Sequence, residues 1–88
     1  MIVKIDRTFE KDINTLQSEK MHKQISYMIE DVRKAINIEA IKSIKKLKGY
    51  KKHYRIRIGD YRAGLIIDGD IAEFIRFLHR KDIYKRFP

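Results

Sequence analysis

The sequence predicts an α+β fold in which an N-terminal strand and a helical hairpin pack on one face of a small, mostly antiparallel sheet. Two patterns support this prediction. In the first half of the chain apolar residues recur at helical spacing, and in the second half they form strand-like runs separated by Gly-Asp turn signals. A chain of 88 residues can bury one small core, so we expect residues 1–88 to form a single domain.

The N-terminal segment, residues 1–37, is expected to form a strand followed by two helices. The run at residues 2–5 is rich in β-branched side chains, which is typical of a strand, and Asp6 or Thr8 can cap the next helix. Residues 17–20 are expected to form the turn between the helices. The expected apolar faces are Phe9, Ile13 and Leu16 in the first helix and Met21, Ile25, Met28, Ile29, Val32 and Ile36 in the second.

Residues 38–48 allow two interpretations. Isoleucines at positions 38, 41 and 44 are followed by Leu47, a spacing that fits either an extension of the second helix or a connection leading into a strand. In both cases Gly49 is expected to end the segment.

The C-terminal half is expected to form three strands. Residues 54–58 alternate apolar side chains with arginines, and Gly59-Asp60 predicts a tight turn into a strand at 61–67. After a second turn at 68–70, residues 71–78 are apolar at both alternating positions, as expected for a strand in the middle of a sheet. Residues 81–87 are expected to add a final helical turn.

The charge is concentrated in one half of the chain. Lys plus Arg number 21 and Asp plus Glu number 12, which gives a net charge of +9. Residues 1–40 contain seven of each sign, whereas residues 41–88 contain fourteen basic and five acidic residues. This asymmetry favours a face that binds a polyanion, and nucleic acid in particular. An anionic membrane surface is the weaker alternative, because the basic segment lacks an amphipathic helical period.

The sequence also lacks the features of several protein classes. It contains no cysteine, which excludes a disulfide framework and the usual structural zinc sites. No His, Asp and Glu residues have metal-ligand spacing and no Gly-rich phosphate loop is present, so we predict neither a metal nor a cofactor. The apolar runs are too short to span a membrane, and the N-terminus has no signal-peptide core. We therefore predict a cytosolic protein without a membrane partner.

Three arginines are expected to share one face of the sheet. If the apolar residues of 54–58 turn into the core, Arg55 and Arg57 project from the opposite face, and Arg62 begins the adjacent strand. A guanidinium group donates two parallel hydrogen bonds to phosphate and stays charged. An ordinary solvated sheet face is the alternative for any one arginine, but three together favour a functional site.

The segment after the last predicted strand offers further chemistry. His79 can transfer protons near neutral pH, Arg80 can stabilise charge on phosphorus, and Tyr84 can stack on a base. The alternatives are that His79 only ends the strand and that Tyr84 only anchors the last turn. Lysines are expected to attract a polyanion such as RNA by charge without reading its sequence; these are Lys42, Lys45, Lys46, Lys48, Lys51, Lys52 and Lys81.

Four motifs together resemble one known family. They are Lys46-Leu47-Lys48-Gly49-Tyr50, Tyr54-Arg55-Ile56-Arg57, Gly59-Asp60-Tyr61-Arg62 and His79-Arg80-Lys81-Asp82-Ile83-Tyr84. In this order they resemble the RelE/ParE toxin superfamily, most closely the RelE branch of type II toxin–antitoxin systems. The resemblance covers essentially the whole chain. It implies an endoribonuclease that enters the ribosomal A site, contacts ribosomal RNA, cuts mRNA without a metal, and binds a cognate antitoxin protein.

The resemblance also implies roles for individual residues. Arg55 and Arg57 stand where relatives place a lysine or arginine that contacts phosphate or helps to activate the nucleophile. Arg62 and Arg80 match arginines that stabilise the phosphate, and Tyr84 matches a tyrosine that stacks on or orients the substrate.

His79 occupies a position that some branches use as an acid. The general base stays unassigned, because an arginine does not readily release its proton. Two other functions stay open, namely a ParE-like inhibitor of DNA gyrase and a nucleic-acid-binding domain without catalysis. The set of Arg62, Arg80 and Tyr84 favours the ribonuclease.

Overall fold

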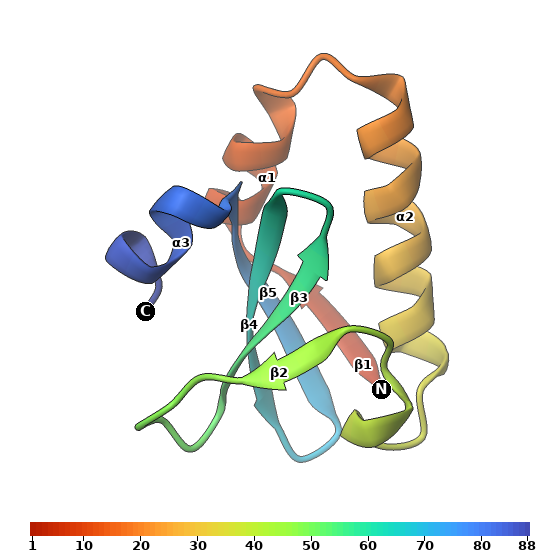
Figure 1. Ribbon diagram of the computed structural model, residues 1–88. Helices are drawn as coiled ribbons and strands as arrows, with labels where there is room; N and C mark the ends of the chain where they lie inside the picture. The colour runs from red at the N-terminus through yellow and green to blue at the C-terminus, as the bar shows by residue number, and fades with distance from the viewer.

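The computed structural model describes residues 1–88 as a mixed five-stranded sheet covered by helices on both faces (Figure 1). The strand order is β1-β5-β4-β3-β2, with β1 parallel to β5 and every other neighbouring pair antiparallel. This arrangement confirms the predicted α+β fold. The elements in chain order are β1 (Ile2–Ile5), α1 (Arg7–Asn14), α2 (Glu19–Lys34), a 3-10 turn η1 (Ile38–Ala40), β2 (Ile44–Lys46), β3 (His53–Ile58), β4 (Tyr61–Asp68), β5 (Ile71–His79) and α3 (Arg80–Arg86).

The two N-terminal helices form the expected hairpin. Asp6 caps α1 by accepting a hydrogen bond from the backbone N–H of Thr8, and Ser18 caps α2 in the same way from Met21. The buried face of α1 centres on Phe9, which is fully covered, and α2 contributes three buried side chains, Ile25, Met28 and Val32. These residues form the larger core together with the facing residues of the sheet.

The end of the helical hairpin differs from the prediction. Helix α2 ends at Lys34, and Ile36, which was expected on its apolar stripe, is 90% exposed. The ambiguous segment 38–48 forms the 3-10 turn η1 and the edge strand β2, so it leads into a strand and does not extend the helix. Three-residue spacing of isoleucines fits a helix, but Ile41 and Ile44 instead pack against the main core from a bend and a strand.

Strand β5 lies between β1 and β4, as expected for its apolar character on both faces. Leu65 pairs with Phe74 but Gly64 pairs with Arg76, so β5 carries one extra residue at this point. As a result Phe74 and Phe77 both contact Phe9 on the helical-hairpin side. A smaller core lies under α3 on the other side and consists of Leu47, Ile83 and Phe87, with Ile75 and Leu78 packed against it.

The predicted turns close the meander. Gly59-Asp60 is a two-residue hairpin loop between the paired residues Ile58 and Tyr61, and Gly59 has a φ of 54°. A positive φ at the first loop position favours glycine because it lacks a Cβ. This loop therefore fixes the register that brings β3 and β4 together.

The helices are too short or too polar to cross a lipid bilayer.

Candidate functional site

Three arginines meet on the sheet face that carries α3. Strands β3 and β4 pair so that Arg57 lies directly opposite Arg62, and Arg55 lies two residues from Arg57 on the same face. Their strand neighbours Ile56 and Ala63 are buried in the larger core on the other face. The alternation seen in the sequence therefore positions the three guanidinium groups as predicted.

Helix α3 adds the remaining two members of the cluster. The backbone N–H of Arg80 donates to the carbonyl of Asp60 at 2.7 Å, which ties the start of α3 to the loop just before Arg62. One turn later, the Tyr84 hydroxyl accepts a hydrogen bond from Nε of Arg55 at 3.2 Å, while the tyrosine remains 59% exposed. The structure thus brings Arg55, Arg57, Arg62, Arg80 and Tyr84 together, and we call these five residues the arginine cluster.

The Arg62 guanidinium is held at the centre of this cluster. Its Nη1 donates to the carbonyls of Gly59 and Tyr61, each at 2.9 Å, while Nε and Nη2 have no partner in the protein. Burial lowers the pKa of Arg62 most, and the charges of Arg55 and Arg57 lower it further. Arg80 adds to this effect and Tyr84 opposes it. Arg62 is therefore oriented in advance, with two free donor groups.

No carboxylate neutralises the arginine cluster. The three ion pairs of the molecule lie elsewhere, between Arg33 and Glu30, Lys52 and Asp68, and Arg76 and Asp12. Like charges that face each other across a sheet are destabilising, and the pair Arg57–Arg62 is such a contact. An anion such as a phosphate group would relieve this repulsion and accept the free N–H donors.

His79 lies apart from the arginine cluster. Its Nδ1 accepts a hydrogen bond from the backbone N–H of Lys81 at 3.1 Å, so it caps α3. Its ring packs edge-on against Tyr61, which stacks on Phe77 on the helical-hairpin side. A small hollow beside it lies between α1 and the start of α3, with Asp12 and Asp82 among its lining residues. Helix capping and packing on Tyr61 therefore give the His79 side chain a structural role.

The lysines predicted to bind RNA spread over several elements. Lys45 of β2 lies opposite Arg55, so it shares the face of the arginine cluster, whereas Lys46 lies opposite Tyr54 on the other face. Lys48 and Lys51 belong to the loop between β2 and β3, which extends away from the body of the molecule (Figure 1). The other three are outside this loop or paired: Lys42 follows η1, Lys52 forms an ion pair with Asp68 at 3.0 Å, and Lys81 is the second residue of α3.

Two residues that the sequence analysis did not select position α3. Gly64 lies under the ring of Phe87, and a Cβ built on Gly64 would lie 2.7 Å from two atoms of that ring. Phe87 is 3% exposed and also packs against His53, with ring centroids 5.5 Å apart. A glycine inside an apolar strand often marks such a close approach, and this was the available signal.

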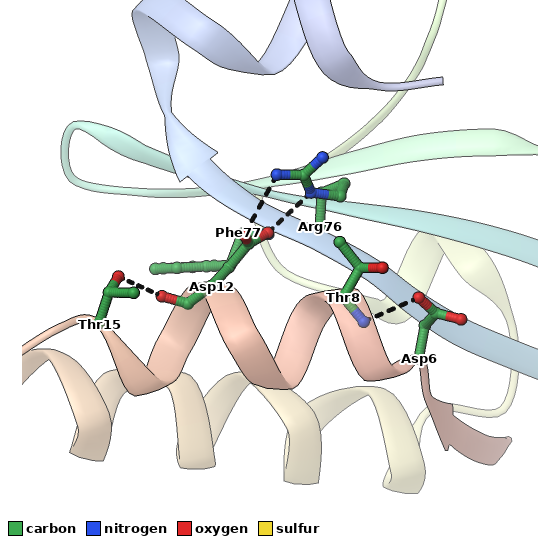
Figure 2. Close-up of polar contacts among 6 residues, drawn as sticks. All are labelled: Asp6, Thr8, Asp12, Thr15, Arg76 and Phe77. Carbon is green, nitrogen blue, oxygen red and sulfur yellow. Dashed lines mark hydrogen bonds and ion pairs between the residues drawn. The ribbon is translucent and has the colours of Figure 1, made fainter.

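A second contact that the sequence analysis missed joins α1 to β5 (Figure 2). Arg76 donates from Nε and Nη2 to the two carboxylate oxygens of Asp12, at 2.8 and 3.2 Å. The same carboxylate accepts a hydrogen bond from the backbone N–H of Phe77 at 2.9 Å. Strand β1 pairs with β5 only as far as Phe74, so Phe77 lies beyond the end of that pairing. The two residues are 64 positions apart in the chain, so no local pattern pairs them.

The donor set of the site suits an anion better than a metal. No three His, Cys, Asp or Glu side chains gather anywhere in the molecule in a way that could hold a metal ion. Guanidinium and phenol groups bind phosphate oxygens and stack on bases, and they are not metal ligands of the usual kind.

Comparisons with known proteins show the family of this chain. Residues 3–84 match the family described as "ParE toxin of type II toxin-antitoxin system, parDE". Toxin RelE3 of Methanocaldococcus jannaschii is 42% identical over 89 residues, which cover 100% of both chains. A chain in the crystal structure of the RelB-RelE antitoxin-toxin complex from Methanococcus jannaschii is 40% identical, with a TM-score of 0.78 and coverage of 97% of this chain and 99% of that chain.

A more distant solved structure is similar to this chain in fold only. The toxin-antitoxin complex RelBE2 from Mycobacterium tuberculosis contains a chain with a TM-score of 0.69, 20% identity and coverage of 92% of both chains. The match over nearly the full length and the identity to Toxin RelE3 agree with the resemblance found in the sequence motifs. This chain belongs to the RelE/ParE superfamily, the toxins of type II toxin–antitoxin systems.

Proposed function

We propose that this toxin is a ribosome-dependent endoribonuclease that cuts mRNA in the A site and thereby inhibits translation. The observation that carries the proposal is the arginine cluster, in which four guanidinium groups and a tyrosine converge on one sheet face without a carboxylate partner. Such a face fits a substrate that brings its own negative charge, and a phosphodiester is that substrate.

The proposed reaction needs no metal. The ribose 2′-hydroxyl attacks the neighbouring phosphorus, the bond to the 5′-oxygen breaks, and a 2′,3′-cyclic phosphate remains. The pentacoordinate transition state carries more negative charge than the phosphodiester does. Arg62, held by two backbone carbonyls, and Arg80 would stabilise this extra charge with oriented donors.

The other members of the arginine cluster bind and orient the RNA in this proposal. Arg55 and Arg57 contact phosphate oxygens beside the cut, and the exposed ring of Tyr84 stacks on a base. The hydrogen bond from Arg55 holds the Tyr84 hydroxyl, so that the aromatic platform and the phosphate site are fixed relative to one another. Lysines outside the cluster attract the ribosome through long-range charge.

The proposed regulator is a cognate antitoxin. The similar chain from Methanococcus jannaschii was crystallised in a RelB-RelE antitoxin-toxin complex. For this chain we propose a partner segment that folds on contact. Its acidic residues would reach the arginine cluster or its backbone would displace α3, and either event would block the site. A complex in which the partner inhibits without touching the arginine cluster or α3 would contradict this proposal.

The class of activity can be tested with purified toxin and programmed ribosomes. We expect mRNA fragments ending in 2′,3′-cyclic phosphate, formed only when ribosomes are present. The rate should not change when trace transition metals are chelated at a fixed magnesium concentration that keeps the ribosome intact. Restoration of lost activity by one added transition metal would refute metal independence.

Inhibition of DNA gyrase is the second candidate, because the matched family carries the ParE description. A supercoiling assay with purified gyrase and the same toxin preparation separates the two functions. We expect no inhibition at concentrations that cleave mRNA on ribosomes. Gyrase inhibition without RNA cleavage would overturn the ribonuclease proposal in favour of this second candidate.

A further inference from the structure

We infer that Tyr50 stacks on an unpaired base of the mRNA and forms a second RNA contact beside the arginine cluster, an inference that rests on the proposed ribonuclease function. Three tyrosines of the molecule are exposed, namely Tyr27, Tyr50 and Tyr84. Tyr27 lies on α2, in the helical hairpin. The other two lie near the sheet face that carries α3, and the arginine cluster uses only Tyr84.

A tight turn holds Tyr50 in place. Its backbone N–H donates to the carbonyl of Leu47 at 3.3 Å, and Gly49 has a φ of 86°. A positive φ at the third residue of such a turn favours glycine. The backbone N–H of Leu47 also donates to the carbonyl of His53 at 2.9 Å, which closes the loop between β2 and β3. Tyr50 is therefore held by an ordered part of this loop.

The ring of Tyr50 packs on a residue of the arginine-bearing face. Its centroid lies 5.0 Å from that of His53, which in turn packs against Phe87. The buried Nδ1 of His53 has no hydrogen-bond partner, so ring packing is the contact that positions this side chain. His53 and Arg55 are two residues apart in β3 and share one face, and Arg55 donates to Tyr84. The two exposed tyrosines thus lie beside successive positions of the same strand face.

The surroundings of Tyr50 suit a nucleotide. Its side chain is 47% exposed, so the contact with His53 leaves nearly half of its surface open. Lys48 and Lys51 lie on either side of it in the loop, and both are exposed and outside the ion pairs of the molecule. Proteins that bind single-stranded nucleic acid combine cations that follow the phosphates with aromatic rings that stack on bases.

Strand β3 gives the direction of the RNA. The face residues Arg57, Arg55 and His53 lead from the β3–β4 hairpin toward the loop that carries Tyr50. Successive side chains on one strand face are about 7 Å apart, about twice the 3.4 Å rise of stacked nucleotides. If Tyr84 stacks on a base beside the cut, Tyr50 reaches a base about two nucleotides further along the same strand.

The test compares the affinity of the toxin for two ribosome complexes. One carries an mRNA with a single 2′-deoxynucleotide at the cut, which lacks the attacking hydroxyl and stays intact. The other carries an mRNA that ends before the A site. Tyr50→Ala should bind the first complex about tenfold more weakly than the wild type does, the loss typical of one base–aromatic stack, and should bind the second equally well. Tyr50→Phe keeps the ring and should keep the wild-type affinity for both.

Tyr27→Ala is the matched control, because it removes an equally exposed type of side chain from α2. It should leave both affinities unchanged. Thermal denaturation of Tyr50→Ala and its cleavage rate at saturation separate base stacking from a structural role. Stacking predicts a saturated rate within about threefold of the wild type, whereas displacement of Phe87 and α3 would lower that rate together with the denaturation midpoint.

A scan of the mRNA identifies the base and uses the wild-type toxin, so it does not depend on the folding of a variant. Single abasic nucleotides are placed at successive positions on both sides of the cut. At one position the missing base should weaken wild-type binding about tenfold, and the same change should have no further effect on Tyr50→Ala. A different position should be coupled to Tyr84→Ala in the same way.

The outcomes are distinguishable. An equal loss of affinity for both ribosome complexes would overturn the inference, in favour of a contact with the ribosome itself. Absence of any abasic position coupled to Tyr50, or an effect of Tyr27→Ala as large as that of Tyr50→Ala, would also overturn it. Failure of the wild-type toxin to cut unmodified mRNA would refute the ribonuclease proposal, and the binding comparison would still decide whether Tyr50 contacts a base.

Discussion

Two arginines on neighbouring strands, Arg76 of β5 and Arg62 of β4, have opposite environments. Arg76 shares both oxygens of the Asp12 carboxylate, and the side chains of this pair are 18% and 13% exposed. Arg62 has no carboxylate and is surrounded by other cations. The same residue type thus joins a helix to a sheet in one place and leaves positive charge unpaired in the other.

The two environments have opposite effects on the stability of the folded state. A charge in a partly buried position is stable when an opposite charge and hydrogen bonds accompany it. Arg62 has only backbone carbonyls, and folding lowers its pKa, so its positive charge disfavours the folded state at every pH at which it remains protonated. We conclude that the Asp12–Arg76 pair stabilises the fold, and we propose that the arginine cluster is retained for an anionic ligand.

The largest expected effect on stability follows from breaking the Asp12–Arg76 pair. Asp12→Ala leaves Arg76 and the Phe77 N–H without their acceptor. Removing one partner of a buried pair costs about 3 kcal/mol or more in the free energy of unfolding, and for this partly buried pair we expect about 2–3 kcal/mol. Arg62→Ala should change that free energy by less than about 1 kcal/mol, because the removal of two hydrogen bonds is offset by relieved repulsion. Urea denaturation of both variants checks this, and equal losses would remove the distinction.

The packing of Phe87 on Gly64 should give the next largest effect. Gly64→Ala introduces a methyl group where the ring lies, so we expect a loss of about 2 kcal/mol, in the range typical of overpacking. The displaced ring should also move α3 and weaken the hydrogen bond between Arg55 and Tyr84. Combining Gly64→Ala with Phe87→Leu should cost less than the sum of the single changes. Strict additivity in thermal denaturation would contradict direct packing of the two residues.

Removal of the lysines outside the arginine cluster should affect binding more than cleavage. Replacing Lys46, Lys48 and Lys51 together by Ala should weaken ribosome affinity and flatten its salt dependence, by about 0.7 in the logarithmic slope for each phosphate that is no longer neutralised. Cleavage at saturation should fall only modestly. A matched triple change of Lys4, Lys20 and Lys23 serves as the control, and an equal flattening in that control would show that only net charge matters.

The smallest expected effect concerns an exposed ion pair. Arg33 and Glu30 are 2.7 Å apart on the surface of α2, with side chains 53% and 48% exposed. Pairs of this kind contribute about 0.5 kcal/mol or less. Glu30→Ala should therefore leave the denaturation midpoint nearly unchanged. A loss comparable with that of Asp12→Ala would mean that burial does not decide the strength of these pairs.

Local patterns predicted much of the fold. Asp6 caps the first helix, Gly59-Asp60 closes the hairpin, and the alternation of residues 54–58 puts Arg55 and Arg57 on one face. The end of α2 was missed because Ile36 continues the helical spacing although the helix ends at Lys34. Such helix boundaries depend on tertiary packing, which the spacing of apolar residues along the chain does not reveal.

Contacts between distant parts of the chain could not be predicted. Asp12 and Arg76 are far apart in sequence, and the ring that packs on Gly64 belongs to Phe87, near the C-terminus. The five members of the arginine cluster were predicted because three lie on strands with clear periodicity or beside a turn, and because the motifs resemble a known family. Their convergence depended on the pairing of β3 with β4 and on α3 docking at Asp60.

The most direct test of the central claim is single-turnover cleavage of ribosome-bound mRNA by Arg62→Ala and Arg80→Ala at saturating toxin, measured beside their ribosome affinity. The claim is that these arginines stabilise the transition state and do not merely hold the RNA. Both variants should remain folded and bind nearly as well as the wild type, with cleavage slower by about 10²-fold or more. Cleavage at the wild-type rate once saturated would contradict the claim and reduce the arginine cluster to a binding surface.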